Sequence, residues 1–394
     1  MTTERPRTRA DIVDTARRLY EDLEFTAVRE WLAADPDRKA VGCLPVYVPR
    51  EVVWAAGVLP VGIHGGGDRL EIIRGDAYYQ SYICHLPRSV VELGLSGRLD
   101  MLSGMLFPST CDVIRNLSGM WQILRPEVYV RYVDVPQVEH PATGLEFWKG
   151  ELSTIYRDMC AIAGTEPSDE ALWAAIDDYD RVRDVIGRLY ALRRDEPWKV
   201  PTEELYLVMR AGEVLPPPDF VDLATAYLEA CHAEPLRRRD NTRVIVVGSF
   251  CEQPPLGLIK TIERAGCYIV GDDFLLGNRM ITRPPERGGD PVEALAHALL
   301  FHHQPSSVMY EPDPDAKEVT IKKMVDAARA DGVIFAAASF CDPALLDRPM
   351  LRAGAEAHGI PCIAFKFSEN TGQFQQFREQ AGTFSDSIKL WGGA

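Results

Sequence analysis

Two runs of alternating apolar and helical segments constrain this 394-residue chain more than any other feature. Short β-branched stretches, such as 58–63 and 332–340, each lead into a segment with helical spacing of its apolar residues. Apolar strands that alternate with helices are typical of a parallel sheet covered by helices on both faces. Between the two runs, residues 144–232 show an almost wholly helical pattern. The sequence therefore predicts two α/β halves joined by a helical segment.

These patterns divide the chain into three parts. We expect a helical N-terminal segment over 1–40, a first α/β domain with a helical extension over 41–235, and a second α/β domain over 236–394. A chain of 394 residues is long enough for two or three domains of about 150 residues each. Apolar spacing also predicts one helix over 9–34 and a strand over 40–48.

The composition argues against several classes of protein. The 43 basic and 58 acidic residues give a net charge of −15, and a negative surface repels the phosphate backbone of nucleic acids. No apolar run approaches the roughly 18 residues that a membrane-spanning helix needs, so no membrane association is expected. The N-terminus lacks the apolar core of a secretory signal, which makes the cytoplasm the expected location.

The chain has nine cysteines, and their positions carry most of the information about chemistry. An odd number of cysteines in a long chain without a secretory signal does not form a disulfide framework. Open parallel sheets bind ligands beyond the carboxyl ends of their strands, so cysteines between a strand and a helix matter most. Cys84, Cys111 and Cys341 each stand close to an expected helix N-terminus in such a region.

A helix N-terminus favours an anion because its backbone N–H groups and its dipole carry partial positive charge, and it therefore stabilises a thiolate. N–H donors to sulfur also tune iron–sulfur clusters. Three thiolates from separate loops could hold three irons of a [4Fe–4S] cluster and leave the fourth iron open. The alternative is inert packing, since the intervals of 26 and 229 residues between these cysteines match no compact ferredoxin or zinc motif.

Cys251 is a rival ligand. The segment GSFCEQPP at 248–255 echoes ASFCDPAL at 338–345, and each segment places its cysteine where a strand gives way to a loop. The residues alone leave the choice between Cys251 and Cys341 open. The remaining cysteines lie in expected helices or strands, where packing is the simpler role: Cys43, Cys160, Cys231, Cys267 and Cys362.

Two polar segments that follow expected strands do not match a known catalytic motif. HGGGD at 64–68 fits neither glycine-rich nucleotide fingerprint, so we expect its glycines to form a tight turn. ATP hydrolysis by this chain alone is therefore not expected. Asp272 and Asp273 could cap a helix, bind a cation or line a cleft, and capping or turn formation is the simplest of these roles.

Five segments, taken in order, resemble the 2-hydroxyacyl-CoA dehydratase and benzoyl-CoA reductase family. They are VGCLPVYVPREVVWAAGVLPV, YICHLPRS, LFPSTCDVIRNLSGMW, VGDDFLLGNR and SFCDP, and they span residues 41 to about 345. Any one segment is weak evidence for the family, whereas the five segments in this order are fairly specific for it. The likeness is greatest to the smaller cluster-bearing subunits, called gamma or C, of the ATP-dependent class I benzoyl-CoA reductases.

The resemblance implies two flavodoxin-like, doubly wound parallel-sheet domains with a [4Fe–4S] cluster between them. It implies that Cys84, Cys111 and Cys341 are the cluster ligands, in preference to Cys251, and that Cys43 is not a ligand. The implied reaction is the reduction of the aromatic ring of benzoyl-CoA, or a related acyl-CoA, to a cyclohexadienoyl-CoA in anaerobic aromatic degradation. The implied partners are a homologous larger cluster-bearing subunit and ATP-hydrolysing activator subunits that ferredoxin recharges.

The chain departs from the family pattern at two places. His85 follows the first cysteine ligand where many members have serine, and it is either a donor of a proton or hydrogen bond or a neutral variation. The tail GQFQQFREQAGTF retains Gln373 but alters the later pattern. The alternatives to a reductase subunit are a subunit of a 2-hydroxyacyl-CoA dehydratase, a non-catalytic cluster-bearing or electron-transfer subunit, and a structural homologue without a cluster.

Overall fold

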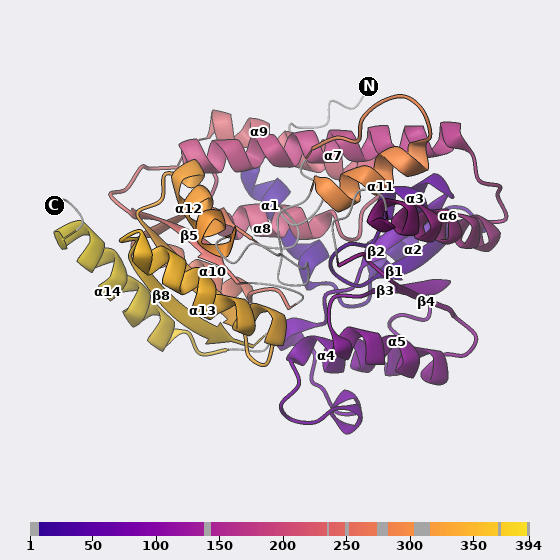
Figure 1. The fold of residues 1–394 in the computed structure, drawn as a ribbon, viewed down its shortest axis with the longest axis horizontal. Coiled ribbons are helices and arrows are strands. Elements are labelled where there is room, and N and C mark those ends of the chain that lie inside the picture. Colours follow the sequence, from indigo (N-terminus) through magenta and orange to yellow (C-terminus); the bar gives the residue numbers. More distant parts are fainter. Residues whose placement is uncertain are drawn as a thin grey trace.

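The computed structural model describes residues 8–137, 143–234, 236–248, 252–273, 283–302, 316–368 and 372–391. Within these residues lie two four-stranded sheets, and every neighbouring pair of strands is parallel (Figure 1). This architecture confirms the predicted α/β, doubly wound fold. The first sheet has the order β2-β1-β3-β4 and consists of β1 (Lys39–Cys43), β2 (Val58–Gly62), β3 (Gly104–Pro108) and β4 (Tyr129–Val133). The second sheet has the order β6-β5-β7-β8 and consists of β5 (Thr242–Val247), β6 (Cys267–Asp272), β7 (Gly332–Ala338) and β8 (Cys362–Phe367).

Helices cover both faces of both sheets, as continuous apolar strands require. The helices of the first half are α1 (Arg9–Glu21), α2 (Thr26–Ala33), α3 (Arg50–Ala55), α4 (His85–Leu95) and α5 (Asp112–Leu124). The middle segment contains α6 (Thr143–Ala163), α7 (Asp169–Asp195), α8 (Thr202–Ala211) and α9 (Pro217–Ala233). The second half contains α10 (Leu256–Arg264), α11 (Pro291–Phe301), α12 (Ala316–Ala328), α13 (Asp342–Ala357) and α14 (Gln375–Trp391). Two short 3-10 turns, η1 (Gly67–Arg69) and η2 (Gly75–Tyr78), precede α4.

Alternate strand residues point to opposite faces of each sheet, and each face has its own core. In the second sheet, Val244 and Val246 pack with α10 and α14, whereas Ile245 and Val247 pack with α12 and α13. The first sheet is built in the same way: one face packs against α4 and α5, and the other packs against α3, α6 and α11. The helix α11, from the second half of the sequence, thus buries its apolar face on the first sheet's side.

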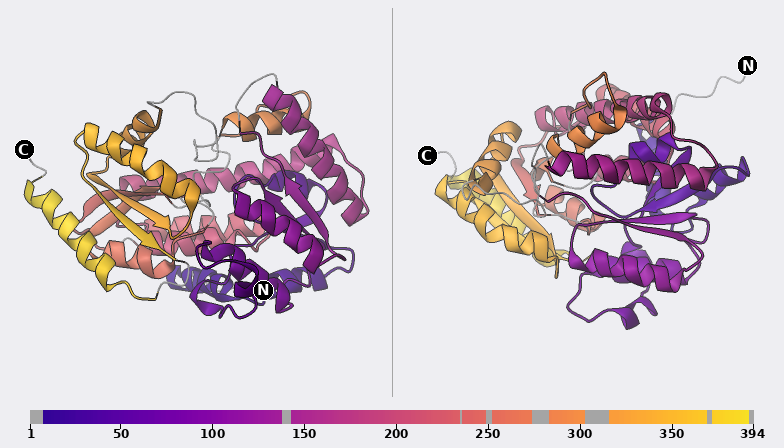
Figure 2. Two further views of the ribbon diagram at one scale, coloured as in Figure 1. Left: turned by 60° about the horizontal axis from the view of Figure 1, so that its bottom comes forward. Right: turned by 45° about the vertical axis from the view of Figure 1, so that its right-hand side comes forward.

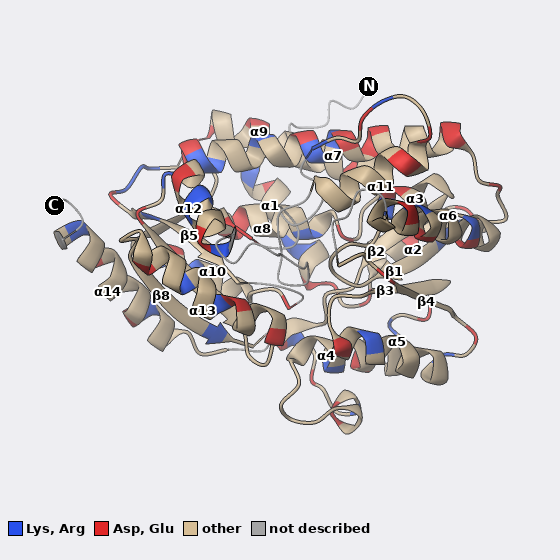
Figure 3. Cartoon of the chain, in the orientation of Figure 1, with Lys and Arg blue, Asp and Glu red and all other residues tan. Residues whose placement is uncertain are grey.

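A layer of middle helices joins the two halves. The long helix α7 contacts α3 beside the first sheet and β6 of the second sheet, and it packs along α9. Figure 2 shows the two sheets in separate halves of the molecule, with this helical layer extending across both. Figure 3 shows acidic and basic residues interspersed along the outer helices. Among the helices that the structure describes, none is long and apolar enough to cross a membrane.

Two predicted elements are wrong in their extent. The single helix expected over 9–34 is two helices, because Phe25 adopts a left-handed backbone conformation with φ of 54° between them. The strand expected over 40–48 ends at Cys43, because Val46 and Tyr47 adopt φ values of 74° and 63°. Residues other than glycine rarely adopt such positive φ values, so secondary-structure propensity does not predict either break.

Candidate functional site

Two of the candidate cysteines follow central strands of the two sheets. Cys111 lies three residues after the end of β3 and is the N-cap of α5, and Cys341 lies three residues after the end of β7 and is the N-cap of α13. In each sheet the strand order reverses beside this strand, between β1 and β3 and between β5 and β7. Ligands of doubly wound sheets bind beyond the carboxyl ends of the strands at this reversal. The two cysteines thus occupy equivalent positions in the two sheets.

The third candidate, Cys84, is the N-cap of α4, which packs beside α5. All three thiols therefore lie at helix N-termini, where the partial positive charge of the unpaired N–H groups favours an anion. Cys84 and Cys111 are half-buried and Cys341 is buried. The structure thus places each of the three sequence-predicted cysteines in the local setting that the sequence suggested.

The thiols of Cys111 and Cys341 both lie within electrostatic range of the Cys84 thiol. Burial raises the pKa of Cys84 most, and negative charge on Glu252, Cys341 and Cys111 raises it further. Burial also raises the pKa of Cys111, while the backbone N–H groups of Val113 and Ile114 and the hydroxyl of Thr110 oppose that rise. If all three were ionised, the charges on Cys111 and Cys341 would repel that on Cys84, and a bound cation would offset this repulsion.

Within the described ranges, no three His, Cys, Asp or Glu side chains converge closely enough to hold a single metal ion. A cubane cluster is a different case, because each thiolate binds a different iron and the thiolates stand further apart. The donor set of three helix-capping thiols fits such a cluster, and cysteine thiolates are its usual ligands.

Tyr79 supplies a second observation at this position, and sequence reasoning missed it. Its hydroxyl is buried and has no hydrogen-bond partner among the described residues. Burial raises the pKa of Tyr79, and the nearby thiols Cys84 and Cys111 raise it further. A buried hydroxyl without a partner is costly, so this donor fits an acceptor such as a cluster sulfur or a bound ligand. No pattern in the sequence around Tyr79 indicates this role.

Glu252 is the other residue that sequence reasoning missed. It is only 1% exposed, and its carboxylate accepts a 3.0 Å hydrogen bond from the backbone N–H of His85, the first residue of α4. The echo between GSFCEQPP and ASFCDPAL was a signal for it, because each cysteine is followed by an acidic residue. The His85 imidazole is half-buried, and its predicted role as a donor stays a prediction.

The other cysteines fall into two groups. Cys251 lies outside the described residues, so the structure does not compare it with Cys341. The rest are free thiols in helices or strands: Cys43, Cys160, Cys231 and Cys267 are buried and Cys362 is half-buried. The pKa of Cys43 is raised to about 12, chiefly by burial. The positive charge of Arg50 opposes this rise, and the Glu213 carboxylate adds to it. Its thiol lies 3.7 Å from the carbonyl oxygen of Val41, as expected for packing.

Asp272 and Asp273 contact distant segments of the chain, and the segment that they were expected to cap or turn lies outside the described residues, so that role stays a prediction. Asp272 is buried at the end of β6, and its carboxylate forms a 2.5 Å ion pair with the buried guanidinium of Arg193. Asp273 accepts hydrogen bonds of 3.0 and 2.9 Å from the backbone N–H of Gly248. These contacts fasten α7 to the second sheet and orient the end of β5, which is a structural function.

A buried charge network lies beside the glycine segment that follows β2. The carboxylate of Glu213 pairs with the guanidinium of Arg50 and, at 2.9 Å, with Nε2 of His64. Burial and the positive charge of Arg210 lower the pKa of His64, Glu213 partly opposes the shift, and the resulting pKa is about 4. His64 is therefore neutral at pH 7. Burial raises the pKa of Glu213, but the positive charge of Arg50 and the hydrogen bonds from Arg50 and His64 outweigh this effect, so the pKa lies below its ordinary value.

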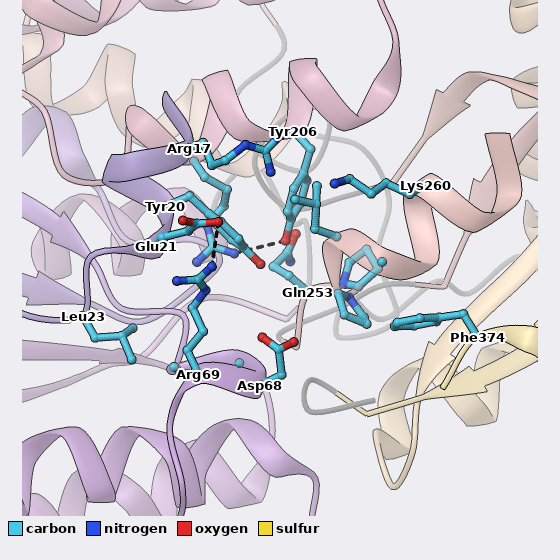
Figure 4. A pocket seen from close by; sticks show the side chains of 18 residues that line it. Arg17, Tyr20, Glu21, Leu23, Asp68, Arg69, Tyr206, Gln253, Lys260 and Phe374 are labelled. Atoms are coloured by element: carbon cyan, nitrogen blue, oxygen red, sulfur yellow. Dashed lines mark hydrogen bonds and ion pairs between the residues drawn. The ribbon is translucent and has the colours of Figure 1, made fainter. Parts of the chain in front are cut away.

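A cavity of about 240 Å³ opens next to this network. It is bounded by α1, by glycines 65–67, by α8 and by the segment 253–257 that leads into α10. In Figure 4, Arg17, Tyr206 and Lys260 approach it from one side, and Asp68 and Arg69 approach it from the other. The glycines form the expected tight turn, with φ values of 79° at Gly65 and 57° at Gly67.

Comparisons with known proteins give a family and its members. The family model described as "2-hydroxyglutaryl-CoA dehydratase, D-component" matches residues 45–388. The chain is 51% identical to a benzoyl-CoA reductase subunit of Thauera aromatica over 382 residues, which are 97% of this chain and 99% of that protein. It is 28% identical to the (R)-phenyllactyl-CoA dehydratase beta subunit of Clostridium sporogenes, over 89% of this chain and 92% of that protein. It is also 28% identical to the beta subunit of the (R)-2-hydroxyglutaryl-CoA dehydratase of Acidaminococcus fermentans, over 89% and 93% of the two chains.

Proposed function

The chain belongs to the 2-hydroxyglutaryl-CoA dehydratase D-component family, and on that premise we propose that it is the smaller iron–sulfur subunit of an ATP-dependent benzoyl-CoA reductase. The observation that carries this proposal is the 51% identity to a reductase subunit over 97% of this chain and 99% of the relative. The proposed reaction reduces the aromatic ring of benzoyl-CoA, or a related acyl-CoA, to a cyclohexadienoyl-CoA. Ferredoxin supplies the electrons through an ATP-hydrolysing activator.

Cys84, Cys111 and Cys341 would hold a [4Fe–4S] cluster in this proposal. When bound, the cluster supplies one-electron transfer at low potential. Support comes from the positions of the three thiols at helix N-termini and from the electrostatic influence of Cys111 and Cys341 on Cys84. Helix N–H groups reduce the cost of the negative charge on the thiolates.

Other residues of this chain would control the surroundings of the cluster. The buried hydroxyl of Tyr79 is positioned to donate a hydrogen bond, and the carboxylate of Glu252 fixes the first turn of α4 through the His85 N–H. The His85 imidazole is a candidate second donor of a proton or hydrogen bond. The apolar faces of α4 and α5 bury one side of the first sheet near the cysteines and exclude water there.

The proposal includes partner proteins. The relatives are named as subunits, which supports a hetero-oligomer with a homologous larger cluster-bearing subunit. The sequence contains no G-x-x-x-x-G-K-[ST] motif, which supports ATP hydrolysis by separate activator subunits. An acyl-CoA substrate is common to the names of the family and of these relatives.

A second candidate function is that of a 2-hydroxyacyl-CoA dehydratase subunit. The family description and the two relatives at 28% identity favour it. Electron stoichiometry separates the two functions. A ring reductase consumes two electrons for each product molecule, whereas a dehydratase recycles its electron and causes no net reduction. A cluster-bearing subunit without catalytic function would bind iron, but substitutions in it close to the substrate would leave the turnover rate unchanged.

The test is to purify the chain anaerobically with its co-expressed partners, measure iron and acid-labile sulfide, and record EPR spectra after reduction. We expect about four irons and four sulfides for each copy of this chain. Cys84→Ala, Cys111→Ala and Cys341→Ala should each remove this iron, and Cys362→Ala, which alters another half-buried thiol, should retain it. An intact cluster in any of the three variants would refute the ligand assignment, and turnover without stoichiometric electron consumption would refute the reductase.

A further inference from the structure

We propose that the 240 Å³ cavity between α1, glycines 65–67, α8 and segment 253–257 binds the phosphate groups of a nucleotide-linked ligand, with Arg210 as the main anion-binding residue. The source of the phosphates is the CoA moiety of the substrate, and this choice alone rests on the proposed function. Free nucleotides carry the same chemistry, and the experiment below separates the two sources.

Arg210 differs from the other cations of this cavity in its partners. Its guanidinium donates a 3.0 Å hydrogen bond to the hydroxyl of Tyr206 and stacks 5.1 Å from the ring centre of Tyr20 and 5.7 Å from that of Tyr206. Across the described part of the chain, no carboxylate lies within ion-pair distance of it. The nearby carboxylate of Glu213 is already engaged by Arg50 and His64.

This arrangement suits an external anion. A guanidinium removed from water needs a charged partner, and phosphate oxygens match its planar fork of donors. The two tyrosine rings hold the fork in place, so little side-chain freedom is lost when an anion binds. Arg210 is therefore preorganised for a ligand rather than for a partner within the chain.

The other cations of the cavity are partly neutralised. Arg17 and Lys260 share the single carboxylate of Glu203, at 3.1 and 2.8 Å, and Arg69 pairs with Glu21 at 2.6 Å. The described lining contains four cationic side chains and two acidic ones, Glu21 and Asp68, and Glu203 behind it is the third carboxylate, which leaves one positive charge in excess. This local excess of positive charge stands out in a chain whose net charge is −15. It favours an anion inside the cavity.

The glycine wall admits a ligand close to the backbone. Gly65 and Gly67 have positive φ and present no side chains, which is the usual reason for glycine where a phosphate approaches the main chain. The backbone N–H of Gly66 donates a 2.7 Å hydrogen bond to the hydroxyl of Ser89 on α4, which fixes the wall. The cavity is smaller than the roughly 300–1,000 Å³ of pockets for whole drug-sized ligands. It therefore suits one end of a longer molecule.

The cavity lies next to the cysteine site. Gln253 lines the cavity, and its neighbour Glu252 accepts the hydrogen bond from His85 beside Cys84. Ser89, which holds the glycine wall, belongs to the same helix α4 that Cys84 begins. A ligand with its phosphates on Arg210 can therefore direct its other end toward the three thiols. A CoA thioester has this form, with phosphates at one end and the reacting acyl group at the other.

The test measures equilibrium binding of CoA, pantetheine, ADP and inorganic phosphate to the assembled complex by calorimetry. Arg210→Gln should weaken CoA binding about 10- to 100-fold at one site per copy of this chain, since a charge-assisted hydrogen-bond pair is lost. Pantetheine lacks the phosphates, so its affinity should not change. Arg98→Gln, which alters a half-buried arginine that is paired with Glu24 outside the cavity, should leave all affinities unchanged.

Several outcomes would decide against the proposal. Unchanged CoA affinity in Arg210→Gln with an unchanged thermal midpoint would overturn the site. Arg210→Lys retains the charge and provides a second variant if Arg210→Gln does not fold, and wild-type affinity in it would contradict a role for the planar fork. If ADP or phosphate binds in an Arg210-dependent way but CoA does not bind, CoA is not the source of the phosphates. Cys111→Ala should lose iron but retain Arg210-dependent CoA binding, so failure of the cluster assignment remains distinct from failure of this site.

Discussion

The backbone N–H of His85 donates a 3.0 Å hydrogen bond to the carboxylate of Glu252, and this bond connects the two halves of the molecule. His85 begins α4 immediately after Cys84, and Glu252 lies in the segment that follows β5 of the second sheet. The position of one candidate ligand in the first half thus depends on a carboxylate supplied by the second half. The same carboxylate places negative charge near the thiol of Cys84.

Substitution of Glu252 should change the reduction potential of the proposed cluster. Glu252→Gln keeps a hydrogen-bond acceptor for the His85 N–H but removes the charge, so reduction becomes easier and the potential should rise by tens of millivolts. Glu252→Ala also removes the acceptor and should lower the iron content. EPR-monitored redox titration measures the first effect. Glu127→Gln, at an exposed position, is the control, and an unchanged potential in Glu252→Gln would contradict the proposed proximity.

Tyr79→Phe should shift the potential in the opposite direction. Loss of a hydrogen-bond donor near the proposed cluster would leave its reduced form less stabilised, so the potential should fall. Without the cluster, the variant should be as stable as the wild type or more stable by about 1 kcal/mol, because a buried hydroxyl without a partner is removed. Redox titration and urea unfolding check the two effects. Tyr82→Phe alters an exposed tyrosine and should change neither quantity.

Gly62→Ala should strongly destabilise the chain. A Cβ at Gly62 would lie 1.8 Å from a carboxylate oxygen of Glu213, which would break the buried network with Arg50 and His64. Disruption of a buried ion pair costs about 3–5 kcal/mol, and we expect a loss of about 3 kcal/mol in the free energy of unfolding. Gly119→Ala has no atom within 4 Å of its added Cβ and lies in α5, so it should be neutral or stabilising by about 1 kcal/mol. Equal stability of the two variants would contradict the steric argument.

Acid should destabilise the chain through His64. Burial lowers its folded-state pKa to about 4, below its ordinary value of 6.5, so the unfolded chain binds more protons between these values. This contribution to stability is complete above pH 6.5 and is lost as pH falls toward 4. At about 1.4 kcal/mol for each pH unit, the wild type should lose about 2 kcal/mol more than His64→Gln between pH 7 and pH 5.

Urea unfolding at the two pH values measures this difference. His232→Gln, at an exposed histidine, serves as the control and should lose as much stability as the wild type. A His64→Gln variant that loses as much stability as the wild type would show that His64 is not the titrating group.

Much of the fold was predictable because it depends on local periodicity. The β-branched runs became strands and the amphipathic runs became helices, and Cys84, Cys111 and Cys341 lie at helix starts as expected. The breaks at Phe25 and at Val46 were not predictable. Left-handed conformations of such residues are held by surrounding packing rather than by their own preference.

By itself, the sequence determined the two sheets, their parallel strands and the helical segment between them, because apolar spacing at periods of two and 3.6 residues is a local property. It also placed cysteines at helix starts. Only the tertiary structure decided that Glu252 contacts α4, that Tyr79 has a buried hydroxyl beside two thiols, and that Arg210 meets tyrosines rather than a carboxylate among the described residues. These properties depend on which distant segments lie side by side, and the energy of a buried polar group is set by those neighbours rather than by its place in the chain.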